Sequence, residues 1–238
     1  MRTASQWQAG MGAALVLVAQ LCLAAYSFDD SGRFADAADW PSFAAMLERH
    51  RATAADLAAC RADAQDCPGH LKRVRVVLER GATLTREQQL RLVNRFVNNR
   101  RYSHDRPRRM EGAGGETRLK SHWQTLGEFL ARGGDCEDFA LAKYFLLREF
   151  GIPAPDMRVV VALDQSVGEH HALLVVRRAD ADVRRTDADM RRNDADGAWL
   201  IDTDNRIHQR KPASIRYVYA VNEEGVWDHQ PNRTRSED

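Results

Sequence analysis

The sequence predicts an α+β fold in which a helical N-terminal part packs on an antiparallel sheet. Apolar residues recur at helical spacing as far as Phe150, and after Gly151 they gather in short β-rich runs separated by polar turns. Helices followed by strands, rather than alternating with them, are typical of α+β domains. With 238 residues, the chain is long enough for one sizeable domain.

The charge balance argues against one class of partner. The chain carries 35 Lys and Arg residues against 34 Asp and Glu residues, which gives a formal net charge of +1. A chain of this kind has no overall field that attracts nucleic acid. We therefore expect no nucleic-acid partner.

The N-terminus is predicted to direct export. An apolar run from Met11 to Ala25 follows a short segment that carries Arg2, and it ends in small residues. The run is shorter than the roughly twenty residues that span a membrane. This pattern is typical of a secretory signal. Residues 1–25 are therefore predicted to be a signal peptide, with an uncleaved membrane anchor as the alternative.

Export changes the interpretation of the cysteines. Cys22 lies inside the signal, and Cys60 and Cys67 are free to form a disulfide in an oxidising compartment. Cys136 is then left unpaired, either as a buried inert residue or as a reactive thiol.

The first third of the chain is predicted to be helical. The expected helices are 40–50 with Pro41 in its first turn, a second short helix capped by Thr53 that holds Leu57 and Cys60, the apolar stretch 71–78, and a helix opened by a capping box of Thr85 and Gln88. The polar segment 100–116, rich in Arg and Gly, is predicted to be a loop.

The strongest helix signal lies in the middle of the chain. A short helix over 123–130 is stopped by Gly133-Gly134, and Asp135 then serves as the N-cap of a helix that runs to Phe150. Cys136 lies in the first turn of this second helix. Gly151 and Pro153 supply its stop signals.

The last part of the chain is predicted to form the sheet, from the β-rich runs 159–163, 172–176, 199–201 and 217–221. Residues 177–197 read as three heptads, RRADADV, RRTDADM and RRNDADG, and are predicted to be a solvated loop insert. Calcium binding by their Asp-x-Asp pairs is an alternative that the flanking arginines weaken. One domain is predicted over 26–228, followed by a polar tail over 229–238.

Residues at three places on these elements have the types needed for nucleophilic catalysis. The positive end of a helix dipole favours the thiolate of Cys136. The pair His170-His171 stands at the head of the strand 172–176, and Asp202 closes the strand 199–201. A cysteine, a base and an orienting carboxylate form a catalytic triad. Asp204 is the alternative acid, and Asp202 is preferred because it directly follows the apolar strand.

Taken singly, each of these residues has an ordinary structural explanation. A lone cysteine is more often structural than catalytic, and paired histidines or an aspartate can belong to surface turns. It is their combination and order that support the catalytic hypothesis. The oxyanion is expected to be held by the amide of Cys136 and a second donor from Trp123.

The neighbours of Cys136 create an electrostatic conflict. Asp135, Glu137 and Asp138 place three carboxylates around the thiol, which raises its pKa. A hard cation resolves the conflict, and clustered oxygen ligands are what Ca²⁺ prefers. These three residues are therefore the predicted calcium ligands.

The segment SHWQTLGEFLARGGDCEDFALAKYFLLREFGIP (121–153) strongly resembles the bacterial transglutaminase-like cysteine proteases of the LapG type. The resemblance continues through QQLRLVNRFVNNRRYSHD (88–105), HHALLVV, WLIDTDN and YVYAVNEEGVW, and covers roughly residues 40–228. It implies a papain-like and transglutaminase-like fold with Cys136 as nucleophile, His171 as base and Asp202 as acid. Asp204 takes the last role if the family's Asp-Asn pair aligns on 204–205.

The resemblance also implies a calcium-dependent periplasmic endopeptidase. Such enzymes bind calcium beside the nucleophile, cleave the N-terminal region of a large surface adhesin, and so release cells from a biofilm. An inner-membrane receptor that senses cyclic-di-GMP holds them inactive. This chain departs from the pattern in the insert 177–197 and in the segment His122-Trp123-Gln124-Thr125, which bears on the substrate cleft.

Two alternatives remain at this level. The first is a transglutaminase or amidase that uses the same triad. The second is a non-catalytic, calcium-dependent binding domain in which Cys136 only packs.

Overall fold

The computed structural model describes residues 26–65, 67–104, 108–111, 117–120, 122–178 and 197–230. The predicted signal peptide, nearly all of the heptad insert and most of the polar tail lie outside these ranges. None of the helices in the described ranges has both the length and the apolar composition that a membrane span requires.

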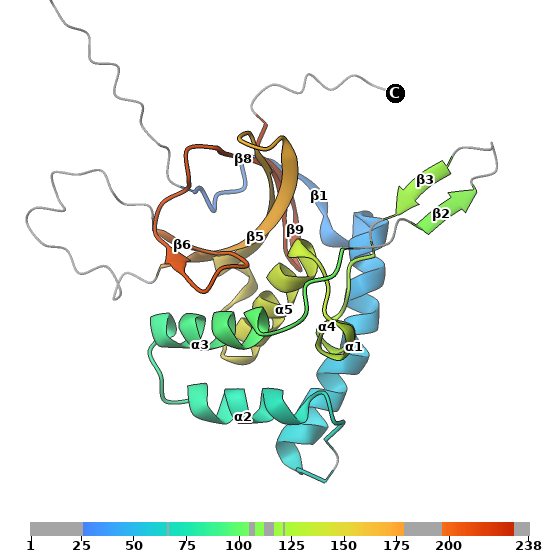
Figure 1. The fold of residues 1–238 in the computed structure, drawn as a ribbon, viewed down its shortest axis with the longest axis vertical. Coiled ribbons are helices and arrows are strands. Elements are labelled where there is room, and N and C mark those ends of the chain that lie inside the picture. Colours follow the sequence, from blue (N-terminus) through green and yellow to red (C-terminus); the bar gives the residue numbers. More distant parts are fainter. Residues whose placement is uncertain are drawn as a thin grey trace, which may run out of the picture.

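A seven-stranded antiparallel sheet forms one layer of the molecule (Figure 1). Its spatial order is β1-β9-β8-β4-β5-β6-β7. The strands are β1 (Arg33–Asp36), β4 (Met157–Asp164), β5 (Glu169–Arg177), β6 (Ala198–Ile201), β7 (Ile207–His208), β8 (Ile215–Val221) and β9 (Gly225–Asp228). The four predicted strands are present. The strands β1, β7 and β9 are additional to these, and none of them shows a run of β-forming apolar residues in the sequence.

The helices form the second layer, on one side of the sheet, and α5 lies centrally against β4 and β5 (Figure 1). They are α1 (Pro41–Ala62), α2 (Lys72–Gly81), α3 (Arg86–Asn98), α4 (Leu126–Arg132) and α5 (Cys136–Glu149), with 3-10 turns η1 (Ala37–Asp39) and η2 (Ala154–Asp156). This arrangement confirms the predicted α+β class.

The helices α3 and α4 both begin at a capping box. The capping box of Thr85 and Gln88 is present at the start of α3. A second box, formed by Thr125 and Glu128, opens α4. In both, the Thr side chain accepts a bond from a backbone amide that has no partner inside the helix.

The prediction of two short helices over 40–62 is wrong. The structure has one continuous helix, α1, and Thr53 lies in its middle instead of capping a second helix. The alanine-rich segment 52–55 around Thr53 contains no glycine or proline, and alanine is the best helix former, so nothing interrupts the helix.

The predicted loop 100–116 is also wrong in part. β2 (Arg108–Glu111) pairs antiparallel with β3 (Thr117–Lys120) as a separate two-stranded sheet. Four-residue strands rich in arginine lack the apolar alternation by which a strand is found from sequence.

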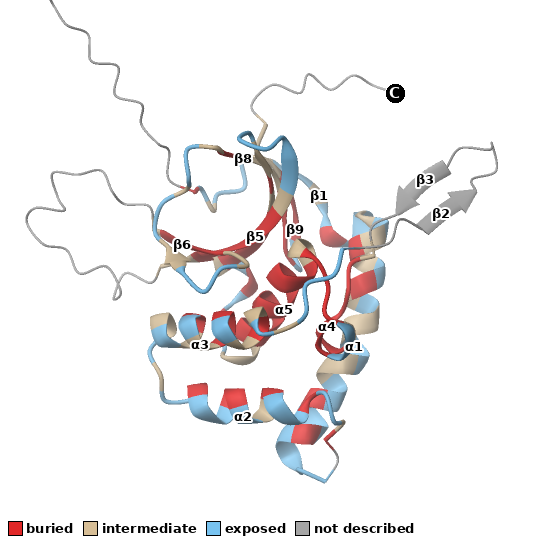
Figure 2. Ribbon diagram, in the orientation of Figure 1, coloured by how far each residue is buried: buried red, intermediate tan, exposed pale blue. Residues whose placement is uncertain are grey.

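The main core lies between the helices and one face of the sheet (Figure 2). Alternation along the strands divides the apolar residues between the two faces. On β4, Val159 belongs to the main core, whereas its neighbour Val160 belongs to a smaller cluster on the outer face. On β5, Leu174 and Leu173 divide in the same way.

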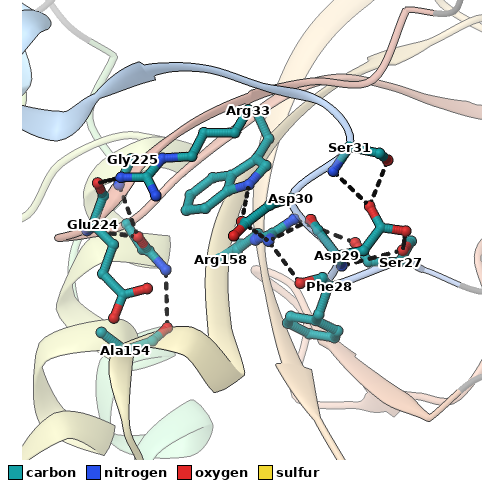
Figure 3. A network of polar contacts seen from close by, with 12 residues as sticks. Ser27, Phe28, Asp29, Asp30, Ser31, Arg33, Ala154, Arg158, Glu224 and Gly225 are labelled. Atoms are coloured by element: carbon teal, nitrogen blue, oxygen red, sulfur yellow. Dashed lines mark hydrogen bonds and ion pairs between the residues drawn. The ribbon is translucent and has the colours of Figure 1, made fainter.

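The N-terminal described segment, residues 26–31, covers this outer face (Figure 3). Buried Arg158 on β4 donates hydrogen bonds to the main-chain oxygens of Ser27, Phe28 and Asp29. Its guanidinium also stacks 3.8 Å from the ring centroid of Trp227. Two of the three guanidinium nitrogens are therefore bonded to the segment that Arg158 anchors, whereas buried Nε has no hydrogen-bond partner among the described residues.

Cys60 at the end of α1 and Cys67 form a disulfide in the structure, and both are buried. Of the cysteines in the described residues, Cys136 alone is free.

Candidate active site

Cys136 is the first residue of α5, and the turn before it requires glycine. Gly133 has φ 77°, in the left-handed region that L side chains rarely adopt. A Cβ atom there would lie 2.1 Å from the main-chain oxygen of Arg101. This close approach lets Gly134 pair with the segment 101–103, because the amide of Ser103 donates to the Gly134 oxygen at 2.8 Å.

Asp135 is the N-cap of α5, as predicted. Its main-chain amide donates a hydrogen bond to Oδ2 of Asp138 at 3.3 Å, and the two residues form a capping box. The box fixes the first turn, and with it the direction of the Cys136 side chain.

The thiol of Cys136 is half-buried between three groups. The carboxylate oxygen Oε2 of Glu137 lies 3.3 Å from Sγ. The main-chain amide of Ala172 on β5 and the phenol of Tyr102 also lie beside the sulfur. Burial, followed by the charge of Glu137, raises the pKa of Cys136 to about 12. The electrostatic conflict expected from the sequence is therefore present.

His171 and Asp202 are in direct contact. Nε2 of His171 lies 2.5 Å from Oδ1 of Asp202, which also accepts the amide of Thr203. The bond to Asp202 raises the pKa of His171 above its ordinary value despite partial burial. Burial raises the pKa of Asp202, but the bond and charge of His171 outweigh it, and the pKa is lowered.

Asp204 makes a different contact. Its Oδ2 lies 2.9 Å from Nε2 of His208, four residues further along the chain. Of the two candidate acids, Asp202 therefore meets His171 and Asp204 does not.

Asp138 is fully buried, and both of its oxygens are bonded within the protein. Oδ1 accepts the main-chain amide of Gln124 at 2.9 Å, and Oδ2 accepts Nε2 of Gln124 at 2.6 Å. Burial raises the pKa of Asp138 to about 7 even though these bonds lower it. Asp138 thus braces the segment before α4, which includes Trp123, against the helix that carries Cys136.

Two hollows meet at Cys136 and His171. The larger, of about 750 Å³, is lined by both residues together with Asp135, Glu137 and Asp202. The smaller, of about 270 Å³, is lined on its apolar side by Trp123, Val161 and Tyr219. The proposed triad Cys136, His171 and Asp202, with Trp123, Asp135 and Glu137, therefore lines these two adjoining hollows, which together form the cleft.

The three predicted metal ligands do not converge. No group of three or more His, Cys, Asp or Glu side chains in the described part of the chain is arranged to hold a metal ion. Asp135 and Glu137 both line the larger hollow, so they supply oxygens of the type that calcium prefers. Asp138 does not line this hollow, because both of its carboxylate oxygens accept hydrogen bonds from Gln124.

Sequence reasoning missed Tyr102 and Gln124. Tyr102 comes from a segment predicted as loop, and its backbone bridge to Gly134 brings the phenol to the thiol. Gln124 gives no local signal, because its partner Asp138 lies one helix further along the chain. Both residues lie within the stretches that carry the family resemblance.

The comparisons with known proteins show the family and the fold. The family model of the bacterial transglutaminase-like cysteine proteinases (BTLCP) matches residues 50–187, more than half of the chain. The matched range contains Cys136 and His171 and ends before Asp202. No curated protein matches the chain significantly.

Among solved structures, calcium-bound LapG of Legionella pneumophila is 23% identical, with a TM-score of 0.54, over 76% of this chain and 91% of that chain. EGTA-treated LapG of the same bacterium is also 23% identical, with a TM-score of 0.53, over 72% of this chain and 84% of that chain. These likenesses show a shared fold.

Proposed function

The chain belongs to the bacterial transglutaminase-like cysteine proteinases, and from that premise we propose that it is an endopeptidase with the triad Cys136, His171 and Asp202. The observation that carries the proposal is the 2.5 Å contact between His171 and Asp202 in the cleft that Cys136 also lines. Because Nε2 of the imidazole is committed to Asp202, Nδ1 is the nitrogen left to exchange a proton with the thiol.

The proposed reaction is acyl transfer followed by hydrolysis. His171 takes the thiol proton of Cys136, and the sulfur attacks the peptide carbonyl carbon. The amide of Cys136 and a donor from Trp123 stabilise the oxyanion. His171 then protonates the leaving amine, and water, deprotonated by the same imidazole, cleaves the thioester. Asp202 orients the imidazole and stabilises its charged form.

Calcium is the proposed cofactor. One similar solved structure, LapG of Legionella pneumophila, is calcium-bound. Asp135 and Glu137 fit this role, because both face the cleft and their charges oppose formation of the thiolate. Calcium bound there would supply positive charge beside the sulfur. Asp138, which the sequence also suggested, would support the site through Gln124 rather than contact the ion.

The proposed substrate is the N-terminal region of a large surface adhesin, and the proposed location is the periplasm. The proposed inhibitor is an inner-membrane receptor that senses cyclic-di-GMP. These three proposals rest on the family resemblance of residues 121–153 and on the predicted signal peptide. The cleft, which is open and joins two hollows beside Cys136, is compatible with an extended polypeptide.

The test uses the exported protein and an N-terminal fragment of a large surface adhesin from the same bacterium. Wild-type protein with calcium is expected to cleave the fragment, whereas Cys136→Ser protein is not. Addition of EGTA should stop cleavage, and excess calcium should restore it. A Cys136→Ser variant that retains full cleavage would overturn the proposal. Incorporation of an amine into the fragment in place of hydrolysis would indicate a transglutaminase.

A further inference from the structure

A buried lysine lies beneath the proposed site and has no place in the mechanism above. Lys143 follows Cys136 by about two helical turns, and so lies on the same face of α5. It is 1% exposed. Among the lysines and arginines whose side chains the structure describes, only Lys143 and Arg158 are buried.

These two buried cations have different surroundings. Arg158 holds main-chain oxygens of the N-terminal segment, on the outer face of the sheet. Lys143 donates from Nζ to the main-chain oxygen of Asp202 at 2.5 Å. Its bond therefore joins the helix of the proposed nucleophile to the residue that carries the proposed acid.

Packing alone does not account for Lys143. Burial of an ammonium group is unfavourable, and a methionine of similar length would fill the space without that cost. Burial lowers the pKa of Lys143 to about 7, although Asp202 and Asp204 raise it. The bond to the carbonyl needs only an N–H donor, so the amine forms it in either protonation state.

Asp202 needs this support because the sheet does not supply it. The strand β6 ends at Ile201, one residue before Asp202. The segment that follows is held instead from the helical layer. Asn94 on α3 donates to the main-chain oxygens of Asp204 and Arg206. Asn98 on α3 donates to the main-chain oxygens of Asp204 at 2.5 Å and of Asp202 at 3.4 Å. From α5, Lys143 donates the shorter bond to Asp202, at 2.5 Å.

We propose that Lys143 is a positioning residue that ties the main chain of Asp202 to the helix of Cys136 and thereby holds the carboxylate against His171. This inference rests on the proposed function, because it takes Asp202 as the orienting acid. Lys143 itself touches neither the thiol nor the substrate in this scheme.

The test compares Lys143→Met with wild-type protein in the presence of calcium. Two readouts need no protein substrate: the rate at which iodoacetamide alkylates Cys136, and the downfield proton resonance of the His171–Asp202 hydrogen bond. We expect alkylation to slow about tenfold or more at neutral pH and the resonance to disappear, since an imidazole without its orienting acid is a poorer base. Lys72→Met, at an exposed site on α2, is the matched control and should change neither.

Lys143→Arg should recover part of the alkylation rate, because it keeps a donor at this position. A folded Lys143→Met protein with an unchanged resonance and an alkylation rate within twofold of wild type would overturn the inference. If that variant does not fold, Lys143→Gln replaces it under the same two criteria. Failure of both variants to fold would make Lys143 a stability residue and would also overturn the inference.

The readouts separate this inference from the proposed function. Slow alkylation in Lys143→Met, together with no adhesin cleavage by wild-type protein, supports the inference and counts against the substrate. Full cleavage and fast alkylation in Lys143→Met would leave the protease function standing and remove the role of Lys143.

Discussion

Gln124 donates two hydrogen bonds to the single carboxylate of Asp138, one from its main-chain amide and one from its side chain. The two residues come from different elements, the segment before α4 and the first turn of α5. Through this pair, the position of Trp123 is coupled to that of Cys136.

Replacement of Asp138 by asparagine should destabilise the protein. The new amide group would direct N–H donors at Nε2 of Gln124, or leave the Gln124 amide without an acceptor, at a fully buried site. We expect a loss of about 1–3 kcal/mol in the free energy of unfolding, measured by urea denaturation. Asp56→Asn, at an exposed site on α1, is the control and should change stability by less than about 0.5 kcal/mol. Equal stability of the two variants would contradict a structural role of the hydrogen bonds between Gln124 and Asp138.

Asp202 and Asp204 should differ sharply in their effect on cleavage. We expect Asp202→Asn to lower kcat by about 10²-fold or more, because His171 loses the acceptor that orients it. Asp204→Asn should retain most of the activity, since its partner is His208. Cleavage of the adhesin fragment by both variants measures this. A larger loss of activity in Asp204→Asn than in Asp202→Asn would show that Asp204, and not Asp202, is the acid of the triad.

The His171–Asp202 pair should stabilise the fold in a defined pH window. The pKa of His171 is raised in the folded state, so its contribution is present below about pH 6.5 and is lost as the pH rises through the folded value. The pKa of Asp202 is lowered, so its contribution is present above about pH 3.9 and is lost as the pH falls through the folded value.

The stability difference between wild type and Asp202→Asn should therefore be greatest at about pH 4–6.5. Urea denaturation of both proteins from pH 3 to pH 9 checks this. Subtracting the free energy of unfolding of the variant from that of wild type removes the contribution of groups that titrate alike in both proteins. A stability difference that grows steadily above pH 7 would show that the His171–Asp202 pair is not its source.

Calcium should raise the thermal stability of the wild-type protein. A ligand present at about 100 times its Kd stabilises the folded state by about 2.7 kcal/mol, and EGTA should reverse the effect. The double variant Asp135→Asn, Glu137→Gln should lose most of the shift in Tm. Glu169→Gln removes another carboxylate that lines the cleft and should keep the shift. A full calcium shift in the double variant would place the ion elsewhere.

Local signals in the sequence were sufficient to predict the helix that carries Cys136. The glycine pair before Asp135 and the cap itself predicted a helix start at Cys136, because a turn with positive φ and an N-cap are set by a few adjacent residues. The same kind of signal failed at Thr53, where a residue suited to a cap lies within a continuous alanine-rich helix.

The choice between the two candidate acids required the tertiary structure. In the β5–β6 register, Leu174 is opposite Ile201 and Val175 is opposite Leu200. Continued past Ile201, that register would set His171 opposite Asp204. The chain instead leaves the sheet at Asp202, whose side chain then reaches His171.

The sequence by itself thus determined the α+β class, the position of Cys136 at a helix start and the family to which its motif belongs. These depend on short-range patterns of capping, period and residue type. Only the tertiary structure decided which carboxylate meets the imidazole, that Asp138 serves Gln124, and that Lys143 lies beneath Asp202. Each of these contacts joins residues from different elements, and its formation depends on how the helices pack on the sheet.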